Sequence, residues 1–249
     1  MYSDGSISKD NLDLYFKEFA KLYRKHFGKS YPIEFILVGG ASILINYNFR
    51  DLTYDVDTLV ISPINIKQII NAITDKYELV NGWLNSDFKR SSSYTPKIIE
   101  KSEFYKSYYG VLTVRTIKRE YLIAMKLKSG REYKHDLSDV AGILSEEYEK
   151  GNLISLDTIK NAYAELYGLE TTIPEFSRYS LELIYKDMNF KKAFEILNAV
   201  EKENEEHIKN LDQEIRATLD EDSIKSMLKQ KLNKKIQNGN REAEIDIDI

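Results

Sequence analysis

Hydrophobic positions near the start of the chain repeat first at the period of a helix and then as a continuous run. Between residues 12 and 27, apolar side chains recur every three or four positions, which predicts an amphipathic helix. Asp10 or Asn11 is expected to cap the start of this helix, and Gly28 its end. The run at residues 35–38 is short and wholly apolar, as a buried strand requires.

The alternation of strands and helices continues to about residue 150. The pattern predicts a strand at residues 56–61, which Pro63 ends, and a strand rich in Val, Thr and Leu at residues 111–117. Short strands are expected within residues 82–110, where the pattern is least regular. Helices are expected at residues 41–45, 66–77, 119–129 and 135–148.

Beyond Gly151 the sequence indicates helices alone. Ser155 is expected to cap a helix, Pro174 to start another, and residues 189–236 carry long helical patterns rich in Lys and Glu. These patterns predict an α+β fold, in which a mixed sheet is flanked by helices and followed by a C-terminal helical domain. The predicted parts are a sheet-containing domain at 1–150, a helical bundle at 151–237 and an acidic, frayed tail at 238–249.

Composition narrows the possible chemistry. The chain of 249 residues has no cysteine, which excludes disulfides, thiolate zinc sites and cysteine nucleophiles. Its three histidines lie far apart in sequence, so a catalytic metal must be held mainly by oxygen ligands, which favours Mg²⁺ or Mn²⁺ over Zn²⁺. The net charge of −4 gives no global basic field of the kind common in nucleic-acid binders, although a local basic groove is still compatible with it.

Targeting to a membrane is not expected. No stretch approaches the ~20 apolar residues that cross a bilayer, and the N-terminus lacks a basic region followed by an apolar run. The expected location is therefore the cytoplasm.

Two aspartates at the start of the second predicted strand are the strongest candidates for chemistry. Asp55 and Asp57 are two residues apart, so in a strand both side chains point to one face, with Cα atoms about 7 Å apart. Such carboxylates repel each other unless a cation lies between them, and their spacing suits a pair of metal ions in phosphoryl chemistry. The alternative is a solvated strand edge or a pair of turn caps.

A Gly-Gly pair follows the first predicted strand. Gly39 and Gly40 let a phosphate approach the backbone closely, and amides at the start of the next helix can donate to it. A tight strand-to-helix turn explains the pair equally well. Arg50 and Thr53, which precede the aspartates, either contact phosphate or hold the loop that carries them.

Further candidates lie in the two helices that follow the last predicted strand. Lys126 lies in an otherwise apolar helical segment, where an unpaired charge is costly, so an anion or carboxylate partner is expected. The alternative is that its side chain extends to the surface. Asp136 and Asp139 lie one turn apart and share a helix face. Asp136 also suits a helix N-terminus, which makes Asp139 the stronger catalytic candidate.

Together these motifs resemble the nucleotidyltransferase superfold, in which Gly-Gly or Gly-Ser precedes an Asp-x-Asp pair. The spacing Arg50-x-x-Thr53-x-Asp55-x-Asp57 resembles the AbiEii-like branch, whose members occur in type IV toxin–antitoxin and abortive-infection systems. That branch also carries a helical lysine, an arginine and an Asp-x-x-Asp motif. These features are matched here by Lys126, Arg131 and Asp136-Leu137-Ser138-Asp139.

The resemblance implies a nucleotidyltransferase-type mixed sheet and a role for each motif. The glycines would shape a phosphate loop, and the paired aspartates would bind Mg²⁺ or Mn²⁺. Lys126 would meet the triphosphate of an NTP, and Asp136 or Asp139 would complete the acidic site. The expected catalytic residues are Asp55, Asp57, Lys126 and Asp139, and the expected binding residues are Gly39, Gly40, Arg50, Thr53, Lys126 and Asp136.

The predicted function is metal-dependent transfer of a nucleotide unit from an NTP to an RNA acceptor, including tRNA, or to a protein. The resemblance further implies a toxin of a toxin–antitoxin or phage-defence system, with a cognate antitoxin as partner. Many members of the superfold carry a third carboxylate on a later strand, but residues 111–117 contain no acid. The alternative is therefore a catalytically silent module of the same fold that binds nucleotide or a partner. Transfer to a small molecule is a third possibility.

Overall fold

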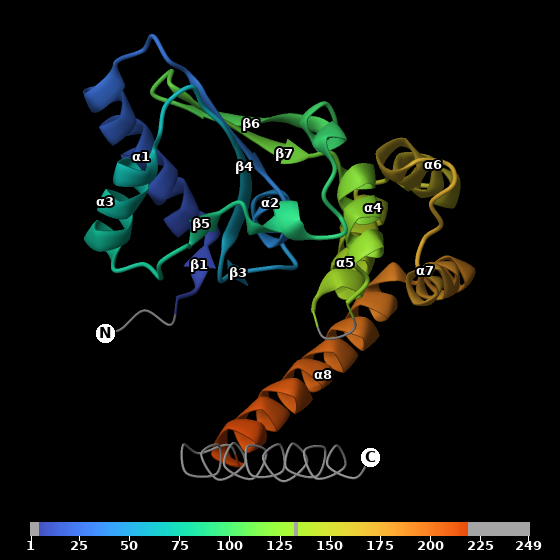
Figure 1. The fold of residues 1–249 in the computed structure, drawn as a ribbon. Coiled ribbons are helices and arrows are strands. Elements are labelled where there is room, and N and C mark those ends of the chain that lie inside the picture. The colour runs from blue at the N-terminus through green and yellow to red at the C-terminus, as the bar shows by residue number, and fades with distance from the viewer. Residues whose placement is uncertain (1–4, 132–133, 219–249) are drawn as a thin grey trace, which may run out of the picture.

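The centre of the molecule is a five-stranded mixed sheet with the strand order β5-β4-β2-β7-β6 (Figure 1). The computed structural model describes residues 5–131 and 134–218, with side chains as far as residue 210, so the predicted tail at 238–249 lies outside the described residues. β2 is antiparallel to β4 and parallel to β7, β5 is parallel to β4, and β6 is antiparallel to β7. The strands are β2 (Ile33–Leu37), β4 (Val56–Ile61), β5 (Leu84–Asn85), β6 (Ser102–Tyr108) and β7 (Leu112–Ile117).

Helices cover both faces of this sheet, which confirms the predicted α+β class. In Figure 1, α1 and α3 lie on one side of the sheet, and α4 and α5 lie on the other. Alternate strand residues fill the two cores: Phe35 and Leu37 pack toward α1, whereas Ile36 packs with α4 and α5. These helices are α1 (Lys9–Phe27), α2 (Gly39–Asn46), α3 (Lys67–Tyr77), α4 (Arg119–Ser129) and α5 (Asp136–Glu149), and two short 3₁₀ turns follow β5 at Asp87–Arg90 and Pro96–Ile99.

The start of α1 corrects one prediction. Ser8, and not Asp10 or Asn11, is the N-cap, and its side-chain oxygen accepts a hydrogen bond from the amide of Asn11 over 3.3 Å. Ser8 is held in an extended conformation because β1 (Ile7–Ser8) pairs with β3 (Leu52–Thr53) in a small antiparallel sheet. The cap is therefore fixed by a contact with a distant segment. Gly28 ends the helix as predicted.

The C-terminal part of the described chain is helical, as predicted. Ser155 caps α6 (Leu156–Tyr167), α7 (Glu175–Asp187) follows Pro174, and α8 (Phe190–Thr218) extends away from the body of the molecule (Figure 1). Side chains of α6, α7 and Phe190 share one hydrophobic cluster with α4 and α5. The domain division near residue 150 stays a prediction. No helix in the described ranges is both long and apolar enough to span a bilayer.

Candidate active site

The two aspartates of the Asp-x-Asp motif flank a buried residue at the start of β4. Val56 is fully buried and Asp57 is half-buried, while Asp55 is exposed, as expected where a strand emerges at the edge of a core. Both aspartates line one cavity of about 270 Å³. Both aspartates therefore lie at one cavity, with Asp55 just before the strand, and their role in binding a metal stays a prediction.

The glycine turn faces these carboxylates. Gly39 has a φ of 55°, and a Cβ atom placed on it would lie 3.7 Å from Oδ2 of Asp57. The amide of Val38 also donates a hydrogen bond to the carbonyl oxygen of Asp57 over 3.0 Å, which ties the turn to the strand. At Gly40 a Cβ would lie 3.0 Å from Oγ1 of Thr53 and 3.3 Å from the Arg50 guanidinium. The backbone can approach the loop this closely because both turn residues are glycine.

The cavity combines an acidic rim with an apolar wall and basic side chains. Its acidic rim includes Asp87, which follows β5 and adds a third carboxylate to Asp55 and Asp57. The apolar wall comes from Val38, Phe88, Leu122 and Met125, and the basic side chains are Lys126 and Arg131.

Burial and the acidic surroundings of Asp57 raise the pKa of its carboxyl group. Burial, and then the carboxylates of Asp55 and Asp87, raise the pKa of Asp57 from 3.8 to about 6. A cation at this point would relieve the repulsion. In the part of the chain that the structure describes, no three acidic or histidine side chains are grouped to hold a metal ion by themselves. Mg²⁺ is commonly held by one or two carboxylates together with substrate phosphates, so the aspartate pair fits such an ion.

Lys126 has the carboxylate partners that its buried position requires. Its ammonium group lies 2.9 Å from Oδ1 of Asp136 and 2.7 Å from Oδ2 of Asp139. Asp136 is 0% exposed and Asp139 is 3% exposed. Each aspartate also has an arginine partner, at 2.9 Å in both cases: Arg131 for Asp136 and Arg50 for Asp139. These five side chains form one ion-pair network beside the cavity, in which Lys126, Asp136 and Asp139 are buried.

The pKa shifts within this network follow from the pairing. Burial alone would raise the pKa of Asp136, but the Lys126 ammonium and the Arg131 guanidinium outweigh it and hold the pKa well below its ordinary value. Burial would likewise lower the pKa of Lys126, but Asp139 and Asp136 raise it above its ordinary value. Lys126 and Asp136 therefore keep their charges across the physiological pH range.

The start of α5, which carries both network aspartates, is capped from a distant helix. Glu201 of α8 is only 3% exposed, and its carboxylate accepts hydrogen bonds from the amides of Leu137 at 2.9 Å and Ser138 at 3.2 Å. Burial raises the pKa of Glu201 to about 7, although these donors oppose the shift. The position of α5 beside the cavity thus depends on contact with α8.

Arg50 and Thr53 contact the loop that carries the aspartates. The Thr53 hydroxyl donates to the carbonyl oxygen of Asp55 over 3.0 Å, and Arg50 donates to the carbonyl oxygen of Leu52 over 3.2 Å. Because Arg50 also pairs with Asp139, it joins this loop to α5.

Sequence reasoning missed Asp87. Its element, β5, has only two residues, too few for a readable alternation of apolar and polar positions. The signal exists in the register alone: Asn85 pairs with Asp57 across the parallel β4–β5 ladder, and Asp87 lies two residues beyond Asn85.

The mixed sheet flanked by helices, with this cavity at its edge, is consistent with a nucleotidyltransferase-type fold. A family model described as "Nucleotidyltransferase of unknown function (DUF6036)" matches residues 15–195. The chain therefore belongs to this nucleotidyltransferase family. The match supports the resemblance to nucleotidyltransferases but does not extend to the AbiEii-like branch. No curated protein and no solved structure matches the chain.

Proposed function

We propose that the protein is a metal-dependent nucleotidyltransferase that moves a nucleotide unit from an NTP to an RNA or protein acceptor. The observation that carries the proposal is one cavity lined by Asp55, Asp57, Asp87 and the Gly39 turn, in a chain of a nucleotidyltransferase family. The AbiEii-like spacing of the motifs supports a role as a toxin, held in check by an antitoxin.

The glycine turn and the acidic rim have separate tasks in this reaction. Amides at the start of α2 bind the triphosphate, with the helix dipole favouring its negative charge. Asp55 and Asp57 hold Mg²⁺, which when bound offsets the charge on the phosphates. The apolar wall formed by Phe88, Leu122 and Met125 offers a surface for the base.

Proton transfer is assigned to Asp87. The acceptor hydroxyl oxygen forms a bond to the α-phosphorus, the bond from that phosphorus to the bridging oxygen breaks, and pyrophosphate leaves. The hydroxyl proton passes to the carboxylate of Asp87, which is exposed at the cavity rim. Asp139 is not assigned this step because Arg50 and Lys126 both pair with its carboxylate. We therefore assign Asp139, Asp136 and Lys126 to holding α4 and α5 beside the cavity.

The test is transfer of label from α-³²P NTPs, with Mg²⁺, to total RNA and to lysate protein. We expect the wild-type protein to label one of these pools and Asp57→Asn to lose the activity while remaining folded. Asp51→Asn is the matched control, because Asp51 is an exposed aspartate of the same loop that does not line the cavity. Equal labelling by wild type and Asp57→Asn would refute the proposal, and no labelling by either would favour a silent binding module. If only an added small molecule were labelled, the acceptor would be a small molecule and not RNA or protein.

A further inference from the structure

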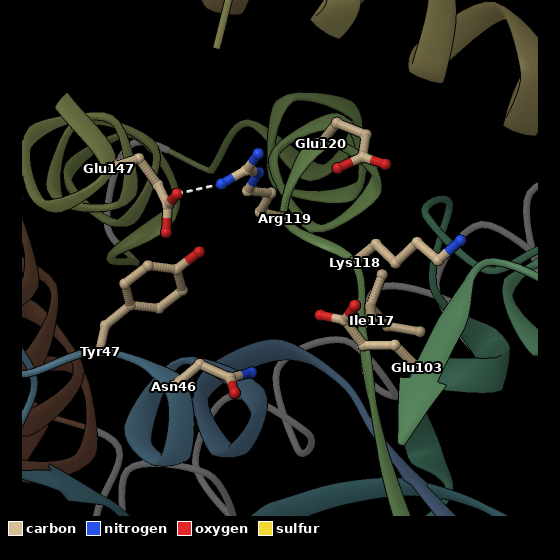
Figure 2. Close-up of a pocket in the computed structure, with 8 residues that line it drawn as sticks. All are labelled: Asn46, Tyr47, Glu103, Ile117, Lys118, Arg119, Glu120 and Glu147. Carbon is tan, nitrogen blue, oxygen red and sulfur yellow. Dashed lines mark hydrogen bonds and ion pairs between the residues drawn. The ribbon is translucent and has the colours of Figure 1, made fainter. Parts of the chain in front are cut away.

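A second cavity, of about 420 Å³, lies at the end of α2 remote from the glycine turn (Figure 2). It is formed by the ends of α2 and β7, the start of α4, Glu103 of β6 and Glu147 of α5. Gly39 and Asn46, which lies at this cavity, are seven positions apart in α2, a distance of about 10 Å along the helix axis. This cavity is therefore distinct from the acidic site, and a ligand bound in it would not depend on nucleotide transfer at that site.

The hydroxyl of a buried tyrosine points into this cavity. Tyr47 is 5% exposed, and Figure 2 shows its hydroxyl directed toward the open centre. Within the described residues that hydroxyl has no hydrogen-bond partner. The ring itself is fixed, because Phe49 packs against it at 5.7 Å between centroids and the Lys150 ammonium lies 5.1 Å from its centroid. Because the hydroxyl is open to the cavity and has no partner in the described part of the protein, it can both donate a hydrogen bond to a ligand and accept one from it.

The charges around the cavity are not balanced. Arg119 pairs with Glu147, so these two charges compensate each other. Glu103 has no ion-pair partner among the described residues, and its carboxylate faces the centre in Figure 2. The Lys118 side chain extends away from the Tyr47 hydroxyl in the same view. Glu120 adds a further carboxylate to the wall. Three carboxylates and two cationic side chains thus line the cavity, and the net negative charge that remains repels a phosphate and attracts a cation.

We propose that this second cavity is a binding site for a small molecule carrying a protonated amine. The amine lies between the Glu103 carboxylate and the Tyr47 hydroxyl oxygen, and the Asn46 side-chain oxygen accepts a further hydrogen bond from the ligand. The Asn46 oxygen is available because its amide nitrogen already donates to the carbonyl oxygen of Ser42 over 3.0 Å.

The experiment is calorimetric titration of the full-length protein in an amine-free buffer at neutral pH. Glucosamine and spermidine are the amine probes and distinguish an amino sugar from a linear polyamine; glucose and inorganic phosphate are the controls. We expect at least one amine to bind and glucose to bind at least tenfold more weakly. Phosphate should compete with neither. Failure of both amines to bind, or equal binding of glucosamine and glucose, would overturn the proposal.

Variants locate the bound amine. Glu103→Gln should weaken amine binding about tenfold, because it removes the uncompensated charge without changing the size of the side chain. Tyr47→Phe should weaken it several-fold while keeping the packing of the ring. Asp57→Asn is the matched control for the acidic site and should leave amine binding unchanged. Loss of binding in Asp57→Asn, with binding retained in Glu103→Gln, would place the amine in the acidic site and refute the assignment.

Discussion

Replacing Lys126 by methionine tests whether this lysine serves the fold or a bound triphosphate. Methionine keeps most of the apolar volume of the side chain, so the main change is loss of the charge that lies between Asp136 and Asp139. Removing one partner of a buried ion pair costs about 3–5 kcal/mol. Because Arg131 and Arg50 still contact the two aspartates, we expect a loss near the lower end, about 3 kcal/mol.

The assay is urea denaturation at pH 7 of the wild type, Lys126→Met, Asp139→Asn and the double variant. Because the lysine and Asp139 are in contact, the double-mutant cycle should show a coupling free energy of about 1–3 kcal/mol. Lys128→Met is the matched control: this lysine is on the same helix but lies over the ring of Tyr167, at 5.4 Å from its centroid. Its replacement should cost less than about 1 kcal/mol.

A stability of Lys126→Met within about 1 kcal/mol of wild type would refute this account. So would additive effects of the two single substitutions. Either result would mean that Lys126 does not compensate the buried aspartates, and it would restore the expectation from the sequence that this lysine meets a triphosphate.

Three further predictions rest on the same site and its supports. In EDTA at pH 8, Asp57→Asn should raise the free energy of unfolding by about 1–2 kcal/mol, after discounting for solvent screening, because a raised folded-state pKa means that the ionised form is disfavoured in the fold; the gain should shrink by about half at pH 5, and a destabilised variant would contradict it. Glu201 has a pKa of about 7, so its carboxylate should reduce the unfolding free energy progressively as pH rises from about 4.5 to 7, by at most about 3 kcal/mol. Glu201→Gln should remove this pH dependence of the unfolding free energy, measured by denaturation across the same pH range. The same pH dependence in wild type and variant would count against the prediction. Gly40→Ala would place a Cβ 3.0 Å from Oγ1 of Thr53, so it should reduce NTP binding in a titration and destabilise the fold by about 1–3 kcal/mol. Full rescue of Gly40→Ala by Thr53→Ala would show that this contact is the cause, and no rescue would assign the defect elsewhere.

Local periodicity identified most of the regular elements. The strands at Val56–Ile61 and Leu112–Ile117, and the helices α3 to α7, lie within a few residues of their predicted bounds. Each of these elements buries one face or a continuous apolar run, so its pattern can be read without knowledge of the partner. The N-cap of α1 was misplaced for the opposite reason, because pairing with β3 selects Ser8.

The sequence by itself also predicted that Asp55 and Asp57 lie together near a glycine turn, as the shared cavity shows, and that a charge at Lys126 needs a partner. Spacing along one element, and the cost of burying a charge, suffice for these conclusions. Only the tertiary structure decided that Asp136 and Asp139 are those partners.

The structure alone also brought Asp87 to the acidic rim and joined five separate elements around the cavity beside Tyr47. Such groupings depend on strand order and helix packing, which bring together residues that are distant in sequence and that no short-range pattern relates.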